Sequence, residues 1–271
     1  MKKILWILVF VFLGCGICEF VLHREEVPSR KDILIYLDED VDLASFESIL
    51  YYILFYACKG RFDIKIVTAA DICNKNWEKT AQILIFPTGD FVSYHRKLGV
   101  IGCQKIRDFV QNGGIFLGVG AGGYLGAKKI EFTMETNLYT KFYELAFFQG
   151  MARGPLLHPC DYNFDRVAKV KVANDSFFCY YDGGGAFVDA EKFENVEILG
   201  TCGDEENLPT IILCKVGSGI AVLSGVSFEL EPEDPEYVDI DSKDDISQKI
   251  WETNFERIKF IESLFRKLGI R

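Results

Sequence analysis

The sequence contains little proline, little histidine and no excess of positive charge. Pro occurs 7 times, His 3 times and Gly 24 times in 271 residues, without a repeat period or a low-complexity segment. Lys and Arg number 30 against 40 Asp and Glu, so the net charge is -10. Nucleic-acid-binding proteins use a basic surface to displace counterions, and a chain with more acidic than basic residues does not favour such a surface. Hydrophobic residues make up 49% of the chain. We therefore expect a compact globular domain with no nucleic-acid partner.

The sequence also lacks the usual patterns of metal and redox sites. Seven of the 9 cysteines lie beyond residue 22 and are scattered without C-x-x-C spacing, which excludes zinc ribbons and thioredoxin-like sites. We expect most of them to be small buried side chains. The acidic stretch 229–245 fails the EF-hand template, because Asp244 and Ile250 stand at the sixth and twelfth positions counted from Asp239. No metal and no cofactor are therefore expected, and the acidic stretch is predicted to be a solvated loop.

One long apolar run lies at the N-terminus. Lys2 and Lys3 precede an uncharged run over residues 4–18, which Glu19 ends. As a helix this run would span roughly 22 Å at ~1.5 Å per residue, less than the ~30 Å hydrocarbon core of a membrane. The pattern favours a signal peptide over residues 1–22 and an exported protein. The alternative is an uncleaved membrane anchor over residues 4–22, which is the only membrane contact we expect.

The rest of the chain begins with alternating strand and helix patterns. Near-continuous apolar runs predict strands, and stretches with a helical pattern between them predict helices, the first rich in Tyr, Phe and Leu and the second amphipathic. The expected strands are 32–37, 62–67, 81–86 and 114–119, and the expected helices are 43–59 and 100–111. This β-α-β-α order is typical of a parallel sheet covered on both faces.

The second half contains short strands that are punctuated by glycine. We expect strands at 167–173, 176–181, 196–201, 209–215 and 219–224, followed by one closing helix over 246–268. Such hairpins predict an antiparallel extension of the sheet. We therefore predict a single α/β domain over residues 30–271, with a doubly wound, mostly parallel sheet of the flavodoxin-like type.

The sharpest local pattern is a glycine-rich turn after the fourth predicted strand. Residues 118–123 satisfy G-x-G-x-x-G, which is typical of dinucleotide-binding turns. Two other interpretations stay open. The turn is also similar to a nucleophile elbow, in which case Gly120 stands where the nucleophile would be. In the third interpretation the glycines simply let a helix pack closely on the sheet.

Five ordered motifs resemble the N-terminal domain of eukaryotic biotin-protein ligases, a relative of class I glutamine amidotransferases. The resemblance covers about residues 32 to 265. Its motifs lie at residues 77–99, 113–124 (GGIFLGVGAGGY), 144–155, 181–187 and 217–229. It implies an amidotransferase-like α/β fold. No basic Gly-Arg-rich segment of the kind that binds an adenylate occurs, so biotinylation by this chain is not expected.

The departures from the family pattern concern catalysis. In glutamine amidotransferases a Cys attacks the amide, a His accepts its proton and a Glu orients the His. The resemblance places Gly120 at the Cys position and Ser227 at the His position, and only Glu229 is retained. A serine hydroxyl is not a base near neutral pH. His95 and His158 lie outside the motif positions. We therefore expect no acyl-transfer catalysis at this site.

The leading hypothesis is a binding or regulatory module that has lost its catalytic groups. A small polar ligand or a peptide segment would bind at the carboxyl ends of the parallel strands. The candidate ligand-binding residues are Thr88, Gly89, Gly120, Ala121, Gly122, Tyr124, Tyr181, Gly184 and Glu229. Two alternatives remain: a hydrolase that uses a relocated thiol such as Cys179 or Cys214, and a nucleotide-binding protein that uses residues 118–123.

Overall fold

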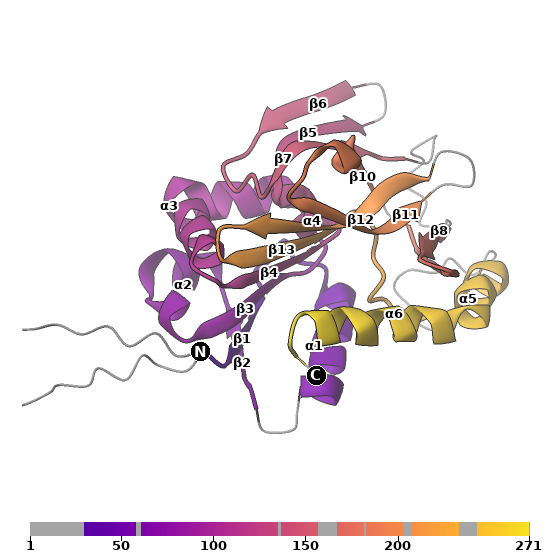
Figure 1. Ribbon diagram of the computed structural model, residues 1–271, viewed down its shortest axis with the longest axis horizontal. Helices are drawn as coiled ribbons and strands as arrows, with labels where there is room; N and C mark the ends of the chain where they lie inside the picture. The colour runs from indigo at the N-terminus through magenta and orange to yellow at the C-terminus, as the bar shows by residue number, and fades with distance from the viewer. Residues whose placement is uncertain are drawn as a thin grey trace, which may run out of the picture.

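The computed structural model describes residues 30–57, 61–134, 137–156, 167–181, 183–202, 207–232 and 243–270. These residues form a nine-stranded sheet in the order β2-β1-β3-β4-β13-β12-β11-β8-β9 and a four-stranded sheet in the order β10-β7-β5-β6 (Figure 1). The predicted leader at residues 1–22 and most of the acidic stretch lie outside the described residues.

Five neighbouring strands of the large sheet run parallel. They are β2 (Asp63–Val67), β1 (Asp32–Tyr36), β3 (Ala81–Phe86), β4 (Ile115–Val119) and β13 (Gly219–Ser224). β1 is buried at all of its residues and β3 at all but one, as expected for strands that are covered on both faces. The predicted parallel sheet is therefore confirmed.

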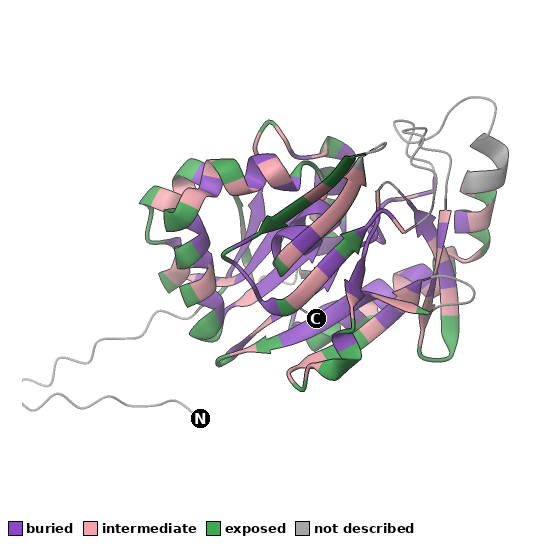
Figure 2. Ribbon diagram, turned by 90° about the horizontal axis from the view of Figure 1, so that it is seen from above, coloured by how far each residue is buried: buried purple, intermediate pink, exposed green. Residues whose placement is uncertain are grey.

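Helices cover both faces of these parallel strands. Figure 1 shows α2 (Ala69–Asn74) and α3 (Phe91–Gln111) on one side, and α1 (Leu43–Ala57) and α6 (Asn254–Lys267) on the other. Figure 2 shows that buried residues concentrate where the helices face the strands. Tyr56 of α1 meets Phe265 of α6 edge to face, with ring centroids 6.0 Å apart. This arrangement is the doubly wound, flavodoxin-like α/β fold.

The large sheet continues with antiparallel strands, as the glycine-punctuated second half predicts. The added strands are β12 (Leu208–Val216), β11 (Val196–Cys202), β8 (Val167–Val172) and β9 (Asp175–Tyr180). Two short 3-10 turns precede strands of this sheet: η1 (Trp77–Lys79) comes before β3, and η2 (Ala190–Lys192) comes before β11.

The four-stranded sheet was not predicted. Its strands are β5 (Ala127–Met134), β6 (Asn137–Phe142), β7 (Phe148–Gly154) and β10 (Ala186–Val188). They follow α4 (Ala121–Leu125), the short helix after the glycine-rich turn. β6 is mostly exposed, so its sequence lacks the apolar alternation that identifies a strand.

Two predicted helices differ from the observed ones. The helix expected over 100–111 begins earlier, at Phe91, and is interrupted at Gly99. The single closing helix expected over 246–268 is two helices, α5 (Lys243–Glu252) and α6, which are separated at Thr253. The Thr253 hydroxyl accepts a hydrogen bond from the Phe178 backbone N–H at 2.8 Å, so this residue is tied to β9. Trp251 and Phe255, on either side of the break, are exposed.

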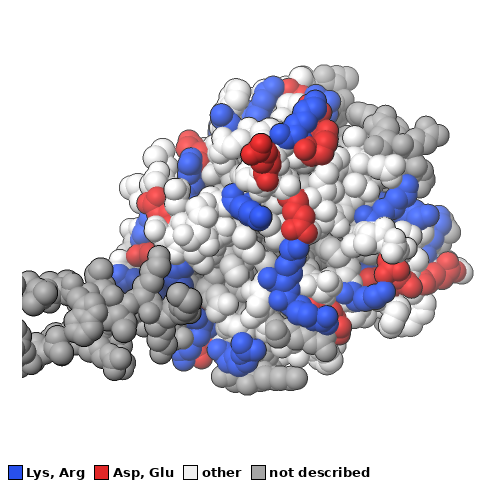
Figure 3. Space-filling view, viewed as in Figure 1, with Lys and Arg blue, Asp and Glu red and all other residues white. Residues whose placement is uncertain are grey.

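Charges of both signs are interspersed on the surface. On the face shown in Figure 3, Lys and Arg side chains lie close to Asp and Glu side chains. Ion pairs such as Lys31–Asp63 and Lys259–Asp175 agree with this distribution. Among the described residues, no helix is both long enough and apolar enough to cross a membrane.

Candidate functional site

The glycine-rich turn forms a sharp strand-to-helix connection. β4 ends at Val119, α4 begins at Ala121, and Gly120 between them has φ 52° and ψ -112°. L-residues seldom adopt this conformation, because their Cβ crowds the backbone. The geometry is that of an elbow, which presents the side chain of its central residue above the sheet. At Gly120 there is no such side chain.

The side chain of Thr88 occupies the space above Gly120. A Cβ added to Gly120 would lie 2.0 Å from Thr88 Oγ1 and 2.7 Å from Thr88 Cβ. The same hydroxyl accepts a hydrogen bond from the Ala121 backbone N–H at 3.3 Å. In acyl-transfer enzymes with an elbow, the N–H after the nucleophile stabilises the oxyanion. Here that N–H is already bonded to Thr88, so the elbow is closed by the protein's own side chain.

Glu229 belongs to the same cluster, but it does not orient Ser227. The Ser45 hydroxyl donates to Glu229 Oε1 at 2.5 Å and accepts from the Thr88 N–H at 3.1 Å. Within the described residues no hydrogen bond joins Ser227 to Glu229. The backbone of Ser227 forms an isolated antiparallel β-bridge with Tyr180 of β9. The arrangement therefore lacks a nucleophile and a base that contact each other.

The Glu229 carboxyl is completely enclosed. The residue is 1% exposed, and its Oε2 has no hydrogen-bond partner among the described residues. Burial raises the pKa of Glu229 to about 7, although the hydrogen bond from Ser45 opposes this shift. Sequence reasoning missed Ser45, which lies 184 residues away in the chain and in no motif.

The glycines of the turn are required by close packing. A Cβ on Gly118 would lie 2.2 Å from the Gly122 carbonyl oxygen, and one on Gly122 would lie 2.3 Å from the Phe86 carbonyl oxygen. A Cβ on Gly123 would lie 2.0 Å from the Ser224 carbonyl oxygen. Gly122 thus lets the turn pack closely on β3, Gly123 lets it pack closely on β13, and Gly118 lets the end of β4 pack closely on α4. These contacts favour the packing interpretation over a phosphate-binding one.

The two candidate tyrosines form a second group beside the elbow. The Tyr124 hydroxyl donates to the Gly183 carbonyl at 2.9 Å, and the Tyr181 hydroxyl donates to the Gly184 carbonyl at 2.9 Å. Both side chains are buried, as is Gly184. Their polar atoms therefore stabilise the loop before β10. Of the predicted ligand-binding residues, Gly89 is exposed, Thr88 is partly exposed, and the others are buried.

The thiols that the relocated-hydrolase hypothesis names are enclosed in the core. Burial raises the pKa of Cys214 to about 12 and that of Cys179 well above its ordinary value. Cys103 and Cys202 are also buried, while Cys73 is partly exposed. A buried thiol without a base is a poor nucleophile. The prediction that most cysteines are small buried side chains is confirmed for the described ones.

Comparison with known proteins identifies the family. The chain has a doubly wound, flavodoxin-like α/β fold, and the family model for the N-terminal part of biotin-protein ligase matches residues 31–271. The chain belongs to this family, as its five motifs predict.

Two relatives and one solved structure illustrate the similarity. A biotin-protein ligase of Schizosaccharomyces pombe is 29% identical over 204 residues, which cover 70% of this chain and 31% of that protein. An uncharacterised protein of Chlamydia muridarum is 34% identical over 167 residues, covering 58% of this chain and 64% of that protein. A putative ThuA-like protein from Bacteroides uniformis has a TM-score of 0.49 at 13% identity, covering 77% of this chain and 86% of that one. The chain therefore spans less than a third of the yeast ligase and under two thirds of the chlamydial protein.

Proposed function

We propose that the protein is a non-catalytic binding or regulatory module built on an amidotransferase-like fold. One observation carries this proposal: the Thr88 side chain fills the position above Gly120 and bonds to the Ala121 N–H. An acyl-transfer enzyme needs this space for its nucleophile and this N–H for its oxyanion. Neither is free, and Ser227 stands in place of a base.

The binding surface in this proposal lies around Thr88 and Gly89, at the carboxyl end of β3. Ligands of open α/β sheets bind outside the carboxyl ends of the parallel strands. Thr88 and Gly89 are the solvent-accessible members of the candidate set, so a small polar ligand or a peptide segment would contact them first. The ligase activity of the yeast relative belongs to that protein and is not part of this proposal.

The catalytic part of the proposal is tested by measuring ammonia release from L-glutamine and the labelling of each thiol by iodoacetamide. We expect no ammonia release above that of buffer. We also expect labelling of Cys73 to exceed labelling of Cys179 and Cys214, because burial keeps the latter two protonated. Selective labelling of Cys179 or Cys214 near neutral pH would support the hydrolase alternative instead.

The binding part is tested with the twenty L-amino acids and the corresponding glycyl dipeptides as probes in thermal unfolding. A probe that binds the native state raises the unfolding temperature. The shift should disappear in Thr88→Val and persist in Thr140→Val, an exposed threonine on β6. Failure of every probe to stabilise the protein would count against this class of ligand. A shift with NAD, FAD or ATP would favour the nucleotide alternative.

A further inference from the structure

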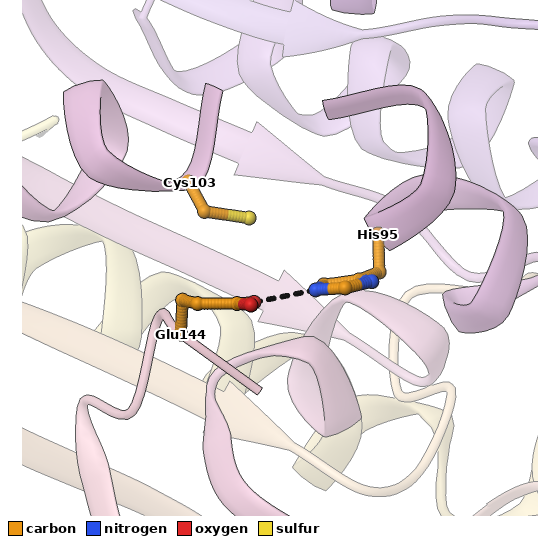
Figure 4. A group of neighbouring side chains, drawn as sticks. All are labelled: His95, Cys103 and Glu144. Atoms are coloured by element: carbon orange, nitrogen blue, oxygen red, sulfur yellow. Dashed lines mark hydrogen bonds and ion pairs between the residues drawn. The ribbon is translucent and has the colours of Figure 1, made fainter. Parts of the chain in front are cut away.

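Three potential metal ligands meet at a place that the elbow does not involve. They are His95 and Cys103 of α3 and Glu144 of the connection between β6 and β7 (Figure 4). One ligand atom from each residue lies within 4.8 Å of the others. The His95 Nε2 and Glu144 Oε2 atoms are 2.5 Å apart. A nitrogen, a sulfur and an oxygen donor thus converge from two separate segments.

The interruption of α3 brings two of the ligands together. His95 and Cys103 are eight positions apart, so in a straight helix their Cα atoms would be separated by about 12 Å along the axis. Gly99 lies midway between them with φ 55° and ψ -166°, which is outside the helical region. A bend at this point allows the two side chains to face the same space.

Neighbouring groups hold the ligands in place. The His95 ring packs edge to face on Tyr143, with centroids 4.5 Å apart. Arg107 Nη1 donates to the Glu144 carbonyl oxygen at 2.8 Å and fixes the loop that carries the carboxylate. Although burial opposes it, the hydrogen bond from His95 holds the pKa of Glu144 below its usual range. Such surrounding contacts orient metal ligands in known sites.

The geometry differs from that of a catalytic Cys-His-Glu relay. A relay requires the thiol at one ring nitrogen and the carboxylate at the other. Glu144 bonds to Nε2, and Figure 4 shows the Cys103 sulfur on the same side of the ring. Burial raises the pKa of Cys103 to about 12, and Glu144 adds to this shift, so the isolated thiol is protonated. Donors that converge on one point fit a cation better than a proton relay.

We infer that His95, Cys103 and Glu144 bind one zinc ion or a similar divalent transition-metal ion. Imidazole, thiolate and carboxylate are all zinc ligands, at ~2.0–2.3 Å from the metal, which places donors about 3.3–3.8 Å apart. The Cys103 sulfur has to move about 1 Å toward the other two atoms, and Nε2 and Oε2, which are 2.5 Å apart, have to separate by about 1 Å. Side-chain rotation can supply both movements. Binding displaces the Cys103 proton to solvent as the sulfur–metal bond forms. The proton in the His95–Glu144 hydrogen bond also leaves Nε2, because the lone pair of that nitrogen binds the metal. Glu144 is 44% exposed, so a water can complete the coordination.

Cobalt(II) tests this inference because a cobalt–thiolate bond has a charge-transfer absorption. The full chain, freed of metal with a chelator, is titrated with CoCl2 and then with ZnCl2. We expect the thiolate absorption to appear at one equivalent and to disappear when zinc replaces cobalt. In Cys103→Ala the absorption should be lost. In Glu144→Gln the affinity should fall at least about 100-fold, since even the loss of an outer partner costs 10–100-fold.

Two matched variants serve as controls. Cys214→Ala removes a buried thiol on β12, and Glu194→Gln removes an exposed carboxylate before β11. Both should retain the wild-type absorption and affinity. Glu144 is partly exposed, so Glu144→Gln is expected to fold even if Cys103→Ala does not. No thiolate absorption in the wild type, or unchanged cobalt affinity in Glu144→Gln, would overturn the inference.

Discussion

At the residue scale, Glu229 is the most unusual group at the elbow. It is a fully buried acid that accepts a hydrogen bond from the neutral Ser45 hydroxyl. An ionised carboxylate is poorly stabilised without water or a cation in direct contact. Its burial raises the pKa to about 7, so the acid binds its proton more tightly in the native state than in the unfolded chain.

Because of this raised pKa, Glu229 is expected to lower the free energy of unfolding as pH rises. Between pH of about 4.5 and 7 the native state holds more protons than the unfolded state, so the free energy of unfolding decreases with pH. The contribution present at low pH is about 3 kcal/mol, and it is lost above pH 7. Urea unfolding at several pH values measures this slope.

Glu229→Gln should flatten the slope between pH 4.5 and 7, because the amide does not titrate. Glu194→Gln, at an exposed position, should leave it unchanged. An equal slope in wild type and Glu229→Gln would mean that the carboxyl is not buried as described.

The motif pattern predicts some of these residues and not others. The order of the motifs points to Gly120, Ser227 and Glu229, and Thr88 belongs to the first motif and directly follows a predicted parallel strand. The contacts between them were not predictable. Ser45 lies in the apolar helix α1, outside every motif, and only folding brings it between Glu229 and Thr88. His95 also lies outside the motif positions. Its proximity to Cys103 and Glu144 depends on the interruption of α3 at Gly99, which the sequence pattern does not show.

At the element scale, the interruption of α3 depends on Gly99. Its φ of 55° and ψ of -166° belong to a region that only glycine adopts without strain. A Cβ added there would meet nothing within 4 Å, so backbone strain alone determines the effect of a substitution.

Gly99→Ala is therefore expected to destabilise the protein by about 1–3 kcal/mol. Val100→Ala, at the neighbouring residue that is 70% exposed, should change stability by less than about 0.5 kcal/mol. Chemical denaturation of the three proteins provides the comparison. If Gly99→Ala were neutral or stabilising, α3 would be a straight helix and alanine would simply improve its propensity.

Elements with a strong apolar pattern in the sequence were predicted. Elements whose position depends on contacts with distant segments were not. The inner parallel strands β1 and β3 are apolar at almost every position, because they are buried on both faces. The four-stranded sheet contains the mostly exposed β6, whose residues show no such pattern. The break between α5 and α6 arises from the bond between Thr253 and β9, while the apolar spacing runs on through it.

At the scale of the whole molecule, a buried arginine joins distant segments. Arg257 of α6 is 0% exposed and donates to the Phe228 carbonyl at 2.8 Å and to the Tyr52 hydroxyl of α1 at 2.9 Å. It also pairs with Glu231 at 3.0 Å. These bonds fix the segment after β13, which carries Ser227 and Glu229, against the helical layer. The segment that carries Ser227 and Glu229 is thus held against α1 and α6.

The elbow is closed by the protein's own Thr88, whose side chain fills the space above Gly120 and bonds to the Ala121 N–H. The most direct test is a double-mutant cycle between Gly120→Ala and Thr88→Gly, measured as the free energy of unfolding. Gly120→Ala alone should cost more than about 3 kcal/mol, from strain and from the contact with Thr88. In the Thr88→Gly background this cost should fall by about 2 kcal/mol.

Gly99→Ala is the matched control for this cycle, because Gly99 has a similar φ but no neighbour at its Cβ position. Its cost should be the same in both backgrounds. Coupling between Gly120 and Thr88, with none between Gly99 and Thr88, is the result that the closed elbow predicts. Additive effects of Gly120→Ala and Thr88→Gly would contradict it, since the space above Gly120 would then be open.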